Sequence, residues 1–410
     1  MRLCRGRPVL RQAVILVGGL GTRLGERTKT TPKPMLPVGG RPFLDTLIDE
    51  IARYDAFDEI LLLAGHKADS ILARYDGTVR GRARLAVSLE QAPLGTAGAL
   101  VHAAGRLQER FLLLNGDSFF DFNILDLVTR ANESLVHMAL RADVVGDRFG
   151  RVVLDGDQVR SFIAPGLGAT GPVNAGVYVI DRGILARVTG LPASLEQDVF
   201  PALAAAGAMT GTSYRGYFID IGIPEDFARA DVELIEQLRR PAVFFDRDGV
   251  LNHDSGYTFE AGKLQWIDGA REAVKAVNDA GCFAFVVTNQ SGVARGFYEE
   301  SHVHALHRWM ADEMAAIGAH IDAFEYCPDH PDGTVERYRR VNDRRKPGPG
   351  MITDLLGRFP VNADASILIG DKPSDLEAAG AAGLQGHLFS GGNLEAFVRM
   401  HLPRRPASAP

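Results

Sequence analysis

Aspartate, lysine and glycine residues follow short apolar runs in two separate parts of this chain, in patterns that suit phosphate chemistry. The first half carries G-G-L-G-T-R-L at 18–24, P-K-P-M at 32–35, N-G-D at 115–117 and D-I-G at 220–222. The second half carries D-R-D-G-V at 246–250, followed by T-N-Q-S-G, R-K-P and G-D-K. The first set suits a nucleotide and the second suits a phosphate ester, so the sequence predicts two enzymes in one chain.

The glycine loop of the first half is a candidate nucleotide site. Glycines directly after a buried strand let backbone N–H groups approach phosphates closely. Arg23 and Lys33 would place two cations beside a triphosphate and offset the charge that develops at its α-phosphorus. Asp117 and Asp220 each end a short apolar run, and two carboxylates at strand ends suit Mg²⁺, which keeps its other positions for phosphate and water.

Residues 13–235 resemble the sugar-1-phosphate nucleotidyltransferases, whose fold is GT-A-like and related to the Rossmann fold. The resemblance rests on the G-G-x-G-T-R-L and P-K-P motifs. It is closest to the branch that activates D-glycero-D-manno-heptose 1-phosphate as its GDP derivative. It implies that Lys33 lies at the reacting phosphates and that Asp117 and Asp220 hold Mg²⁺. It also implies that the triphosphate is held by a set of loop residues: Gly18, Gly19, Gly21, Thr22 and Arg23.

The same resemblance implies contacts to the rest of the nucleotide and to the sugar. L-G-T-A-G at 94–98 resembles the loop that contacts base and ribose, through Gly95 and Thr96. The sugar phosphate would be contacted by Asn174, Gly176 and Glu196. For Asn174 and Glu196 the alternative is a role in a turn or on the surface.

The second half offers a nucleophile and an acid/base. Asp246 and Asp248 follow the apolar run 242–245, and their period-two spacing puts both carboxylates on one side of the chain. One can attack phosphorus and form an aspartyl phosphate, while the other protonates the leaving alkoxide and then activates water. Thr288 can bind the transferring phosphoryl group, and Lys346 supplies a cation.

These motifs, in this order, resemble the haloacid dehalogenase superfamily. D-R-D-G-V-L-N, V-T-N-Q-S-G-V-A-R-G and R-K-P-x-P-G-M are closest to the D-glycero-D-manno-heptose-1,7-bisphosphate 7-phosphatases, over about 242–390. The resemblance implies Asp246 as nucleophile, Asp248 as acid/base, Asn289 as a phosphoryl binder and Arg345 as a sugar-phosphate contact. Asp246, Asp248 and Asp371 are the predicted Mg²⁺ ligands. Asp375 is a candidate for a carboxylate that contacts these ligands without binding the ion itself. Histidinol-phosphate phosphatases are close relatives and remain the alternative.

One segment departs from these relatives. Many of them have a structural zinc loop, C-x-H followed by C-x-C before R-K-P. Here the segments are C-P-D-H at 327–330 and N-D-R at 342–344, so only Cys327 keeps its type. Structural zinc sites need four protein ligands, and we predict no zinc. No large cap domain is expected, and the segment 327–345 would shape the mouth of the site. It is rich in arginine: Arg337, Arg339, Arg340, Arg344 and Arg345.

Composition sets the domain organisation. A chain of 410 residues exceeds what one core supports, and alternating strand and helix patterns predict two α/β domains with largely parallel sheets. We expect a nucleotidyltransferase domain at 1–238, a phosphatase domain without a large cap at 242–400, and a disordered tail at 401–410.

A net charge of -6 argues against nucleic-acid binding, and no apolar run reaches membrane-spanning length. Three cysteines suit a reducing cytoplasm, and homo-oligomer formation stays open.

Together the two halves suggest one pathway. The phosphatase would remove the 7-phosphate of a heptose 1,7-bisphosphate, and the nucleotidyltransferase would couple the heptose 1-phosphate to GTP. The alternatives are a hexose-1-phosphate nucleotidyltransferase fused to a phosphatase of different substrate, and a regulatory sugar-nucleotide-binding protein. The residues alone leave open which of GTP, TTP, UTP or CTP is used.

Overall fold

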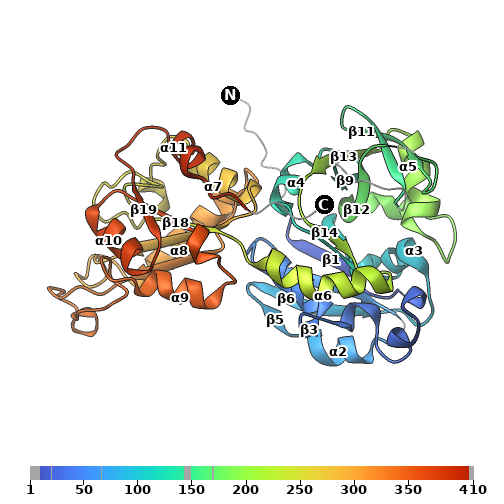
Figure 1. Ribbon diagram of the computed structural model, residues 1–410, viewed down its shortest axis with the longest axis horizontal. Coiled ribbons are helices and arrows are strands. Elements are labelled where there is room, and N and C mark those ends of the chain that lie inside the picture. Colours follow the sequence, from blue (N-terminus) through green and yellow to red (C-terminus); the bar gives the residue numbers. More distant parts are fainter. Residues whose placement is uncertain (1–9, 20, 66, 143–148, 169, 406–410) are drawn as a thin grey trace. The chain divides into compact units, whose positions relative to one another are not determined.

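The computed structural model describes residues 10–19, 21–65, 67–142, 149–168 and 170–405. The chain forms two compact α/β units, and the boundary in the sequence falls between Glu236 and Gln237 (Figure 1). The expected domain boundary at 238–242 lies a few residues further along the chain.

The first unit is built on one ten-stranded sheet. Its strand order is β10-β11-β13-β9-β12-β7-β1-β4-β6-β5. The strands are β1 (Gln12–Leu16), β4 (Glu59–Ala64), β5 (Val79–Arg80), β6 (Ala83–Leu89), β7 (Arg110–Asn115), β9 (Val136–Arg141), β10 (Arg151–Asp155), β11 (Gln158–Ile163), β12 (Val173–Asp181) and β13 (Met209–Tyr214). Strands β7, β1, β4 and β6 are parallel, so the expected glycine loop after β1 and the aspartate after β7 leave the same edge of the sheet.

The other end of this sheet contains antiparallel pairs beside one parallel pair, β13 with β9, whereas the sequence predicts largely parallel strands. Strand β12 runs antiparallel to both β7 and β9, and β11 runs antiparallel to β10 and β13. The sheet is therefore mixed rather than largely parallel. Strands β10 and β11 are only partly buried, and such one-sided strands lack the continuous apolar run that marks a parallel strand.

Helices cover both faces of the first unit's sheet. They are α1 (Phe43–Ala52), α2 (Asp69–Tyr75), α3 (Gly95–His102), α4 (Ile124–Arg130), α5 (Phe200–Ala205) and α6 (Pro224–Leu238). Val14 of β1 packs in a core with Leu100 of α3 and Phe200 of α5. Its neighbours Ala13 and Ile15 point to the other face and are equally buried. Two short pairs, β2 (Pro37–Val38) with β3 (Arg41–Pro42) and β8 (Ser118–Phe120) with β14 (Phe218–Asp220), lie outside the large sheet.

The second unit has a wholly parallel five-stranded sheet in the order β17-β16-β15-β18-β19. The strands are β15 (Ala242–Phe245), β16 (Phe283–Asn289), β17 (Ala323–Cys327), β18 (Ile367–Gly370) and β19 (Gln385–Leu388). Val243 and Phe245 enter one core, while Ala242 and Phe244 enter another. The period-two alternation of β15 therefore divides its side chains between two apolar layers.

Helices form those layers. The first core takes residues from α7 (Ala270–Asp279), α8 (Glu300–Ala315) and α11 (Leu394–His401). The second takes residues from α9 (Gly350–Arg358) and α10 (Pro373–Ala381). Since β15 is central and apolar on both sides, the residues that follow it are held at the edge of a rigid sheet.

Residues near both ends of the second unit form hydrogen bonds with the rest of that unit. Arg240 is 1% exposed, its N–H donates to Pro360 O, and its carbonyl accepts from the N–H of Asn362. His401 closes α11, and the carbonyl of Pro403 accepts from the Cys282 thiol. Of the tail at 401–410 that we expected to be disordered, residues 406–410 lie outside the described residues.

Every helix within the described ranges is too short or too polar to cross a membrane.

The two units should fold independently, because each closes its own cores. We expect segments 1–238 and 239–410 each to give a single cooperative thermal transition by circular dichroism. Segment 242–410, which lacks Arg240, should melt several degrees lower, since losing about 1 kcal/mol shifts the midpoint of a domain of this size by roughly 2–4 °C. Failure of both 1–238 and 239–410 to fold would contradict the two-unit architecture.

Candidate active sites

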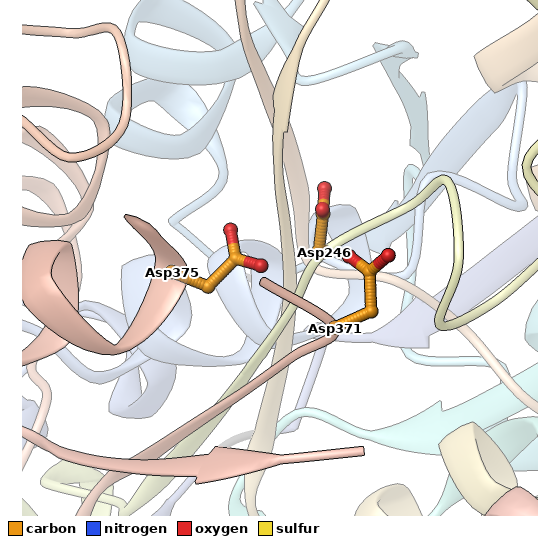
Figure 2. Close-up of side chains that lie close together, drawn as sticks. All are labelled: Asp246, Asp371 and Asp375. Atoms are coloured by element: carbon orange, nitrogen blue, oxygen red, sulfur yellow. The ribbon is translucent and has the colours of Figure 1, made fainter. Parts of the chain in front are cut away.

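Three aspartate carboxylates lie together at the carboxyl-terminal edge of the second unit's sheet. Asp246 follows β15 and Asp371 follows β18, and these parallel neighbours end at the same edge. Asp375 comes from the first turn of α10. One oxygen of each carboxylate lies within 4.8 Å of the others, and Figure 2 shows the three side chains gathered in one place.

Two glycines allow this close approach. A Cβ atom on Gly370 would lie 2.2 Å from the Cβ atom of Asp375, and one on Gly249 would lie 2.3 Å from Oδ2 of Asp371. Both distances are below van der Waals contact, so a side chain at either position would displace an aspartate. Gly249 also has a φ of 96°, which side-chain-bearing residues rarely adopt.

The ammonium group of Lys346 balances part of the negative charge. Its Nζ lies 2.9 Å from Oδ1 of Asp246 and 2.7 Å from Oδ1 of Asp375. Burial opposes the charged form of this lysine, but the two carboxylates outweigh it and its pKa is raised. Burial also raises the pKa of Asp246 to about 6, against the lowering effect of Lys346. Lys372 is a second, more exposed cation, whose Nζ lies 3.7 Å from Oδ2 of Asp371 and 3.1 Å from Oδ2 of Asp254. Two ammonium groups among four carboxylates leave an excess of negative charge at this edge of the sheet.

This set of oxygens fits Mg²⁺. The ion takes oxygen ligands and uses one or two carboxylates besides water and phosphate. Oδ1 of Asp371 is buried and finds no hydrogen-bond donor in the described part of the chain, and burial raises the pKa of this residue. A buried carboxylate oxygen without a donor is unfavourable unless a cation compensates it. Asp246, Asp371 and Asp375 are therefore the side chains that would hold the ion.

The Asp248 carboxylate faces different partners. It accepts hydrogen bonds from Nη2 of Arg247 at 2.8 Å, from Nδ2 of Asn252 at 2.9 Å and from Nε2 of Gln290 at 2.9 Å. Arg247 itself is fully buried. The sequence grouped Asp248 with the metal ligands, whereas the carboxylate cluster of the structure contains Asp375. Three donors hold the Asp248 oxygens, and its part in metal binding stays a prediction. Asp248 lines the pocket beside the cluster.

Gln290 joins Asp248, the predicted acid/base, to Thr288, the predicted phosphoryl binder. Its Nε2 also donates to Oγ1 of Thr288 at 2.9 Å, and its Oε1 accepts from the Tyr298 hydroxyl at 2.7 Å. Thr288 is 1% exposed, so its hydroxyl is fixed at the end of β16. Sequence reasoning missed this role for Gln290, although the residue lies within T-N-Q-S-G.

Asn289 holds the backbone of Lys346. Its Nδ2 donates to the carbonyl of Lys346 and its Oδ1 accepts from the N–H of Lys346, both at 3.0 Å. These two bonds position the lysine, and the predicted phosphoryl contact of Asn289 stays a prediction. Both residues line a pocket of about 670 Å³, together with Asp246, Thr288, Tyr257 and Lys372.

Arg345 is the arginine of the segment 327–345 that lines this pocket. Burial and the nearby Arg295 guanidinium lower the pKa of Arg345. Nε of Arg295 is buried without a hydrogen-bond partner in the described part of the chain. Two guanidinium groups near each other repel, and an anion between them would relieve that repulsion.

Two other arginines of the segment are paired with carboxylates, so its positive charge is smaller than its arginine content suggests. Nε of Arg340 lies 2.8 Å from Oδ2 of Asp329. Arg344 forms ion pairs with Glu325 and Asp354. The Arg337 guanidinium stands 4.4 Å above the centre of the Tyr338 ring.

The positions that correspond to a zinc loop do not fit zinc. Cys327 is fully buried and burial raises its pKa, which favours the neutral thiol over the thiolate that zinc binds. Asp329 accepts hydrogen bonds from Arg340 and Asn342, and Asn342 Oδ1 accepts from the N–H of Arg344. Of the four positions, Asp329 and Asn342 are hydrogen-bonded to other residues, and Arg344 carries a positive charge.

The first unit's glycine loop is shaped by close packing. Gly21 has a φ of 63°, and a Cβ atom there would lie 3.2 Å from Cβ of Lys33. A Cβ atom on Gly18 would lie 3.1 Å from the nitrogen of Gly65, whereas one on Gly19 would meet open space. Thr22 begins the short helix η1 (Thr22–Thr28) and is exposed. The loop therefore presents backbone to the surface where a phosphate can approach.

Lys33 joins the two predicted metal ligands of this unit. Its Nζ lies 2.6 Å from Oδ2 of Asp117 and 3.6 Å from Oδ1 of Asp220, and the lysine is 6% exposed. A Cβ atom on Gly222 would lie 3.1 Å from this Nζ and 3.3 Å from Nη2 of Arg23. The D-I-G turn thus brings both cations and both carboxylates together. Two partly exposed carboxylates beside a glycine loop fit Mg²⁺.

The predicted nucleotide loop and one predicted sugar contact are bonded to each other. Oγ1 of Thr96 donates to Oε2 of Glu196 at 3.0 Å and accepts from the N–H of Leu195 at 2.7 Å. A Cβ atom on Gly95, which has a φ of 77°, would lie 2.3 Å from the carbonyl oxygen of Ala193. Gly95 is therefore required for this contact between two loops.

Asn174 and Gly176 form an irregularity in β12. The register with β9 shifts between Asn174 and Tyr178, and Gly176 has a φ of 74°. Asn174 donates to the Tyr178 hydroxyl at 2.8 Å and accepts from the N–H of Gly176 at 3.0 Å. A Cβ atom on Gly176 would lie 2.8 Å from Nδ2 of Asn115, so the glycine brings β12 against N-G-D.

Comparison with known proteins assigns each unit. Residues 12–237 match the Nucleotidyl transferase family and residues 343–408 match the HAD-hydrolase-like family. The chain is 49% identical over 164 residues to a D-glycero-beta-D-manno-heptose-1,7-bisphosphate 7-phosphatase of Rhodopseudomonas palustris, covering 40% of this chain and 91% of that protein. It is 42% identical over 147 residues to the corresponding D-glycero-alpha-D-manno enzyme of Burkholderia mallei, covering 36% and 78%.

The first unit also resembles a solved structure. HddC from Yersinia pseudotuberculosis is 29% identical, with a TM-score of 0.50, and the match covers 55% of this chain and all of that protein. The fold and sites thus define a nucleotidyltransferase joined to a phosphatase, as the sequence predicts. The chain belongs to the Nucleotidyl transferase family through its first unit and to the D-glycero-D-manno-heptose-1,7-bisphosphate 7-phosphatases through its second. It is a bifunctional enzyme.

The purified protein should contain less than about 0.1 zinc ion per chain by elemental analysis, because structural zinc needs four suitable ligands. Treatment with a chelator should leave the thermal midpoint unchanged, since no metal is expected to hold the fold together. One zinc ion per chain would contradict the assignment of Asp329, Asn342 and Arg344 to ion pairs and hydrogen bonds.

Proposed function

We propose that this protein makes a GDP-heptose in two steps. The second unit removes the 7-phosphate of D-glycero-D-manno-heptose 1,7-bisphosphate, and the first unit transfers GMP from GTP to the resulting heptose 1-phosphate, releasing pyrophosphate. The observation that carries the proposal is the presence, in one chain, of a nucleotidyltransferase site and a unit 49% identical to a heptose-bisphosphate 7-phosphatase. Similarity to HddC and the resemblance to the guanylyltransferase branch support the choice of nucleotide.

In the phosphatase unit Asp246 is the nucleophile. Its Oδ1 is held by Lys346 Nζ at 2.9 Å and by the N–H of Arg247 at 2.7 Å, which leaves Oδ2 to attack phosphorus. The bond from phosphorus to the sugar oxygen breaks, and Asp248 gives a proton to the departing oxygen. Asp248 then takes a proton from water, which attacks the aspartyl phosphate and frees phosphate. Mg²⁺ held by Asp246, Asp371 and Asp375 would supply neutralisation of phosphoryl charge.

Neighbouring side chains prepare this chemistry. Gln290 and Arg247 fix the Asp248 carboxylate beside the cluster, and Thr288 offers its hydroxyl to the phosphoryl group. Lys346 stays charged and stabilises the oxygens that gain charge in the transition state.

In the nucleotidyltransferase unit the sugar 1-phosphate supplies the nucleophile. One of its oxygens attacks the α-phosphorus of the triphosphate, and the bond to pyrophosphate breaks. Lys33 and Arg23, which both lie at the D-I-G turn, offset the charge that develops there. Asp117 and Asp220 would hold Mg²⁺, which supplies further charge neutralisation. Glu196 and Asn174 are held in fixed positions near this site and are the proposed sugar contacts.

The proposal predicts that the two reactions can be abolished one at a time. Asp246→Asn should lower phosphate release at least about a thousandfold, because an amide is a poor nucleophile. It should leave nucleotidyl transfer to supplied heptose 1-phosphate unchanged. Lys33→Ala should lower nucleotidyl transfer and leave phosphate release unchanged. The measurement is separate detection of phosphate and pyrophosphate, with each of the four nucleoside triphosphates and with both anomers of the sugar.

The outcomes discriminate between the alternatives. Turnover of TTP or UTP with a hexose 1-phosphate, without turnover of the heptose, would favour a hexose-1-phosphate nucleotidyltransferase. Equal hydrolysis of histidinol phosphate and heptose bisphosphate would favour the broader phosphatase. Loss of both activities in either variant would contradict independent sites.

Arg345 should bind the phosphate that is not removed. The first unit needs the 1-phosphate, so the phosphatase must spare it, and Arg345 offers a positive charge at the pocket, with the Arg295 guanidinium near enough to lower the pKa of Arg345. Arg345→Ala should raise KM for the bisphosphate by roughly 10-fold or more, because hydrogen bonds between charged groups contribute about 1.5–3 kcal/mol. KM for p-nitrophenyl phosphate should stay the same. Arg339→Ala, an exposed arginine of the same segment, is the matched control.

A further inference from the structure

A fully buried carboxylate organises the segment that delivers Arg345 to the pocket. The segment runs from Cys327, the last residue of β17, to Lys346, and its regular structure consists of the short helix η7 (Glu336–Tyr338). Asp329 lies inside it and is 0% exposed. Taking a carboxylate out of water is unfavourable unless charged partners and hydrogen bonds compensate it. The partners of Asp329 must therefore offset the cost of burying its charge.

The carboxylate and the backbone oxygen of Asp329 contact residues at the end of the segment. Its Oδ2 accepts from Nε of Arg340 at 2.8 Å and from Nδ2 of Asn342. Its backbone oxygen accepts from Nη1 of Arg345 at 3.4 Å. Asn342 in turn accepts the N–H of Arg344 with its side chain and the N–H of Arg345 with its backbone. One aspartate thus reaches the guanidinium of Arg345 directly and its backbone through Asn342.

The Asp329 contacts include an unusual feature. Oδ1 is also buried and has no hydrogen-bond partner in the described part of the chain. The carboxylate therefore relies on Arg340 and Asn342 alone, and replacing either partner would leave a buried charge poorly compensated. A short irregular segment without a disulfide or a fitting metal site needs internal ion pairs and hydrogen bonds of this kind to hold one conformation.

We propose that Asp329 is a positioning residue of the phosphatase, whose ion pair with Arg340 and hydrogen bond to Asn342 hold Arg345 at the pocket. The effect of Asp329 on substrate specificity rests on the proposed function, in which Arg345 binds the second phosphate of the substrate. Lys346, which follows Arg345, is held separately, because Asn289 bonds to both its backbone N–H and its carbonyl.

The first test follows the segment itself. Asp329→Asn keeps the size of the side chain and removes its charge. In the full-length protein, hydrogen exchange of residues 328–345 should rise by about 10-fold or more, which corresponds to roughly 1.4 kcal/mol of lost local stability. Exchange in β15 and β16 should not change. Arg340→Lys should keep most of the protection and Arg340→Ala should lose it, while Arg337→Ala serves as the control.

The second test links the segment to Arg345. Asp329→Asn should raise KM for a sugar bisphosphate by about the same factor as Arg345→Ala, with kcat for p-nitrophenyl phosphate within about twofold of the original. The double variant should be no worse than Arg345→Ala alone, because both changes remove one interaction. Nucleotidyl transfer reports that the rest of the chain is intact.

The outcomes separate this proposal from the proposed function. Unchanged exchange in 328–345 would overturn the role of Asp329, whatever the substrate. Increased exchange with additive effects on KM would show that Asp329 stabilises the segment without acting through Arg345, and would also overturn it. If the heptose bisphosphate is not hydrolysed by the original protein, the proposed function fails, and fructose 1,6-bisphosphate against p-nitrophenyl phosphate still measures the effect of Asp329.

Discussion

Each unit holds a nearly buried lysine between two aspartates, and this interaction is the constraint on which both sites depend. Lys33 lies between Asp117 and Asp220, and Lys346 lies between Asp246 and Asp375. A buried ammonium is stable only when its partners are fixed at short distance, since desolvation of each charge must be offset. Parallel strands supply part of that rigidity, because Asp117 and Asp246 follow strands of the two sheets at their carboxyl ends, while Asp220 ends β14 of a short antiparallel pair and Asp375 lies in α10.

The glycines at these edges are a consequence of the same constraint. Gly249, Gly370 and Gly222 stand where a Cβ atom would strike an aspartate of the site. Small residues there let carboxylates approach one another and the lysine, and the excess negative charge in the second unit then favours a divalent cation. The arrangement therefore follows from charge balance within a small volume.

Much of this was predictable from the sequence, because motif residues at the ends of apolar runs must converge when the strands are parallel. The two-domain α/β class and the enzyme families are confirmed. What the sequence could not reveal depends on side-chain direction. Asp375 joins the carboxylate cluster and Asp248 does not, because the buried Arg247 draws the Asp248 carboxylate to itself. Counting arginines in 327–345 likewise could not show that Arg340 and Arg344 pair with acidic neighbours.

The union of two units in one polypeptide has a consequence for the cell. Since both sites are translated together, they are present in equal numbers whatever the level of expression or degradation. The balance between the steps is then set by the turnover numbers of the two sites alone. A mutation that slows one site cannot be corrected by making more of that enzyme by itself, so selection must act on the two catalytic rates as a matched pair.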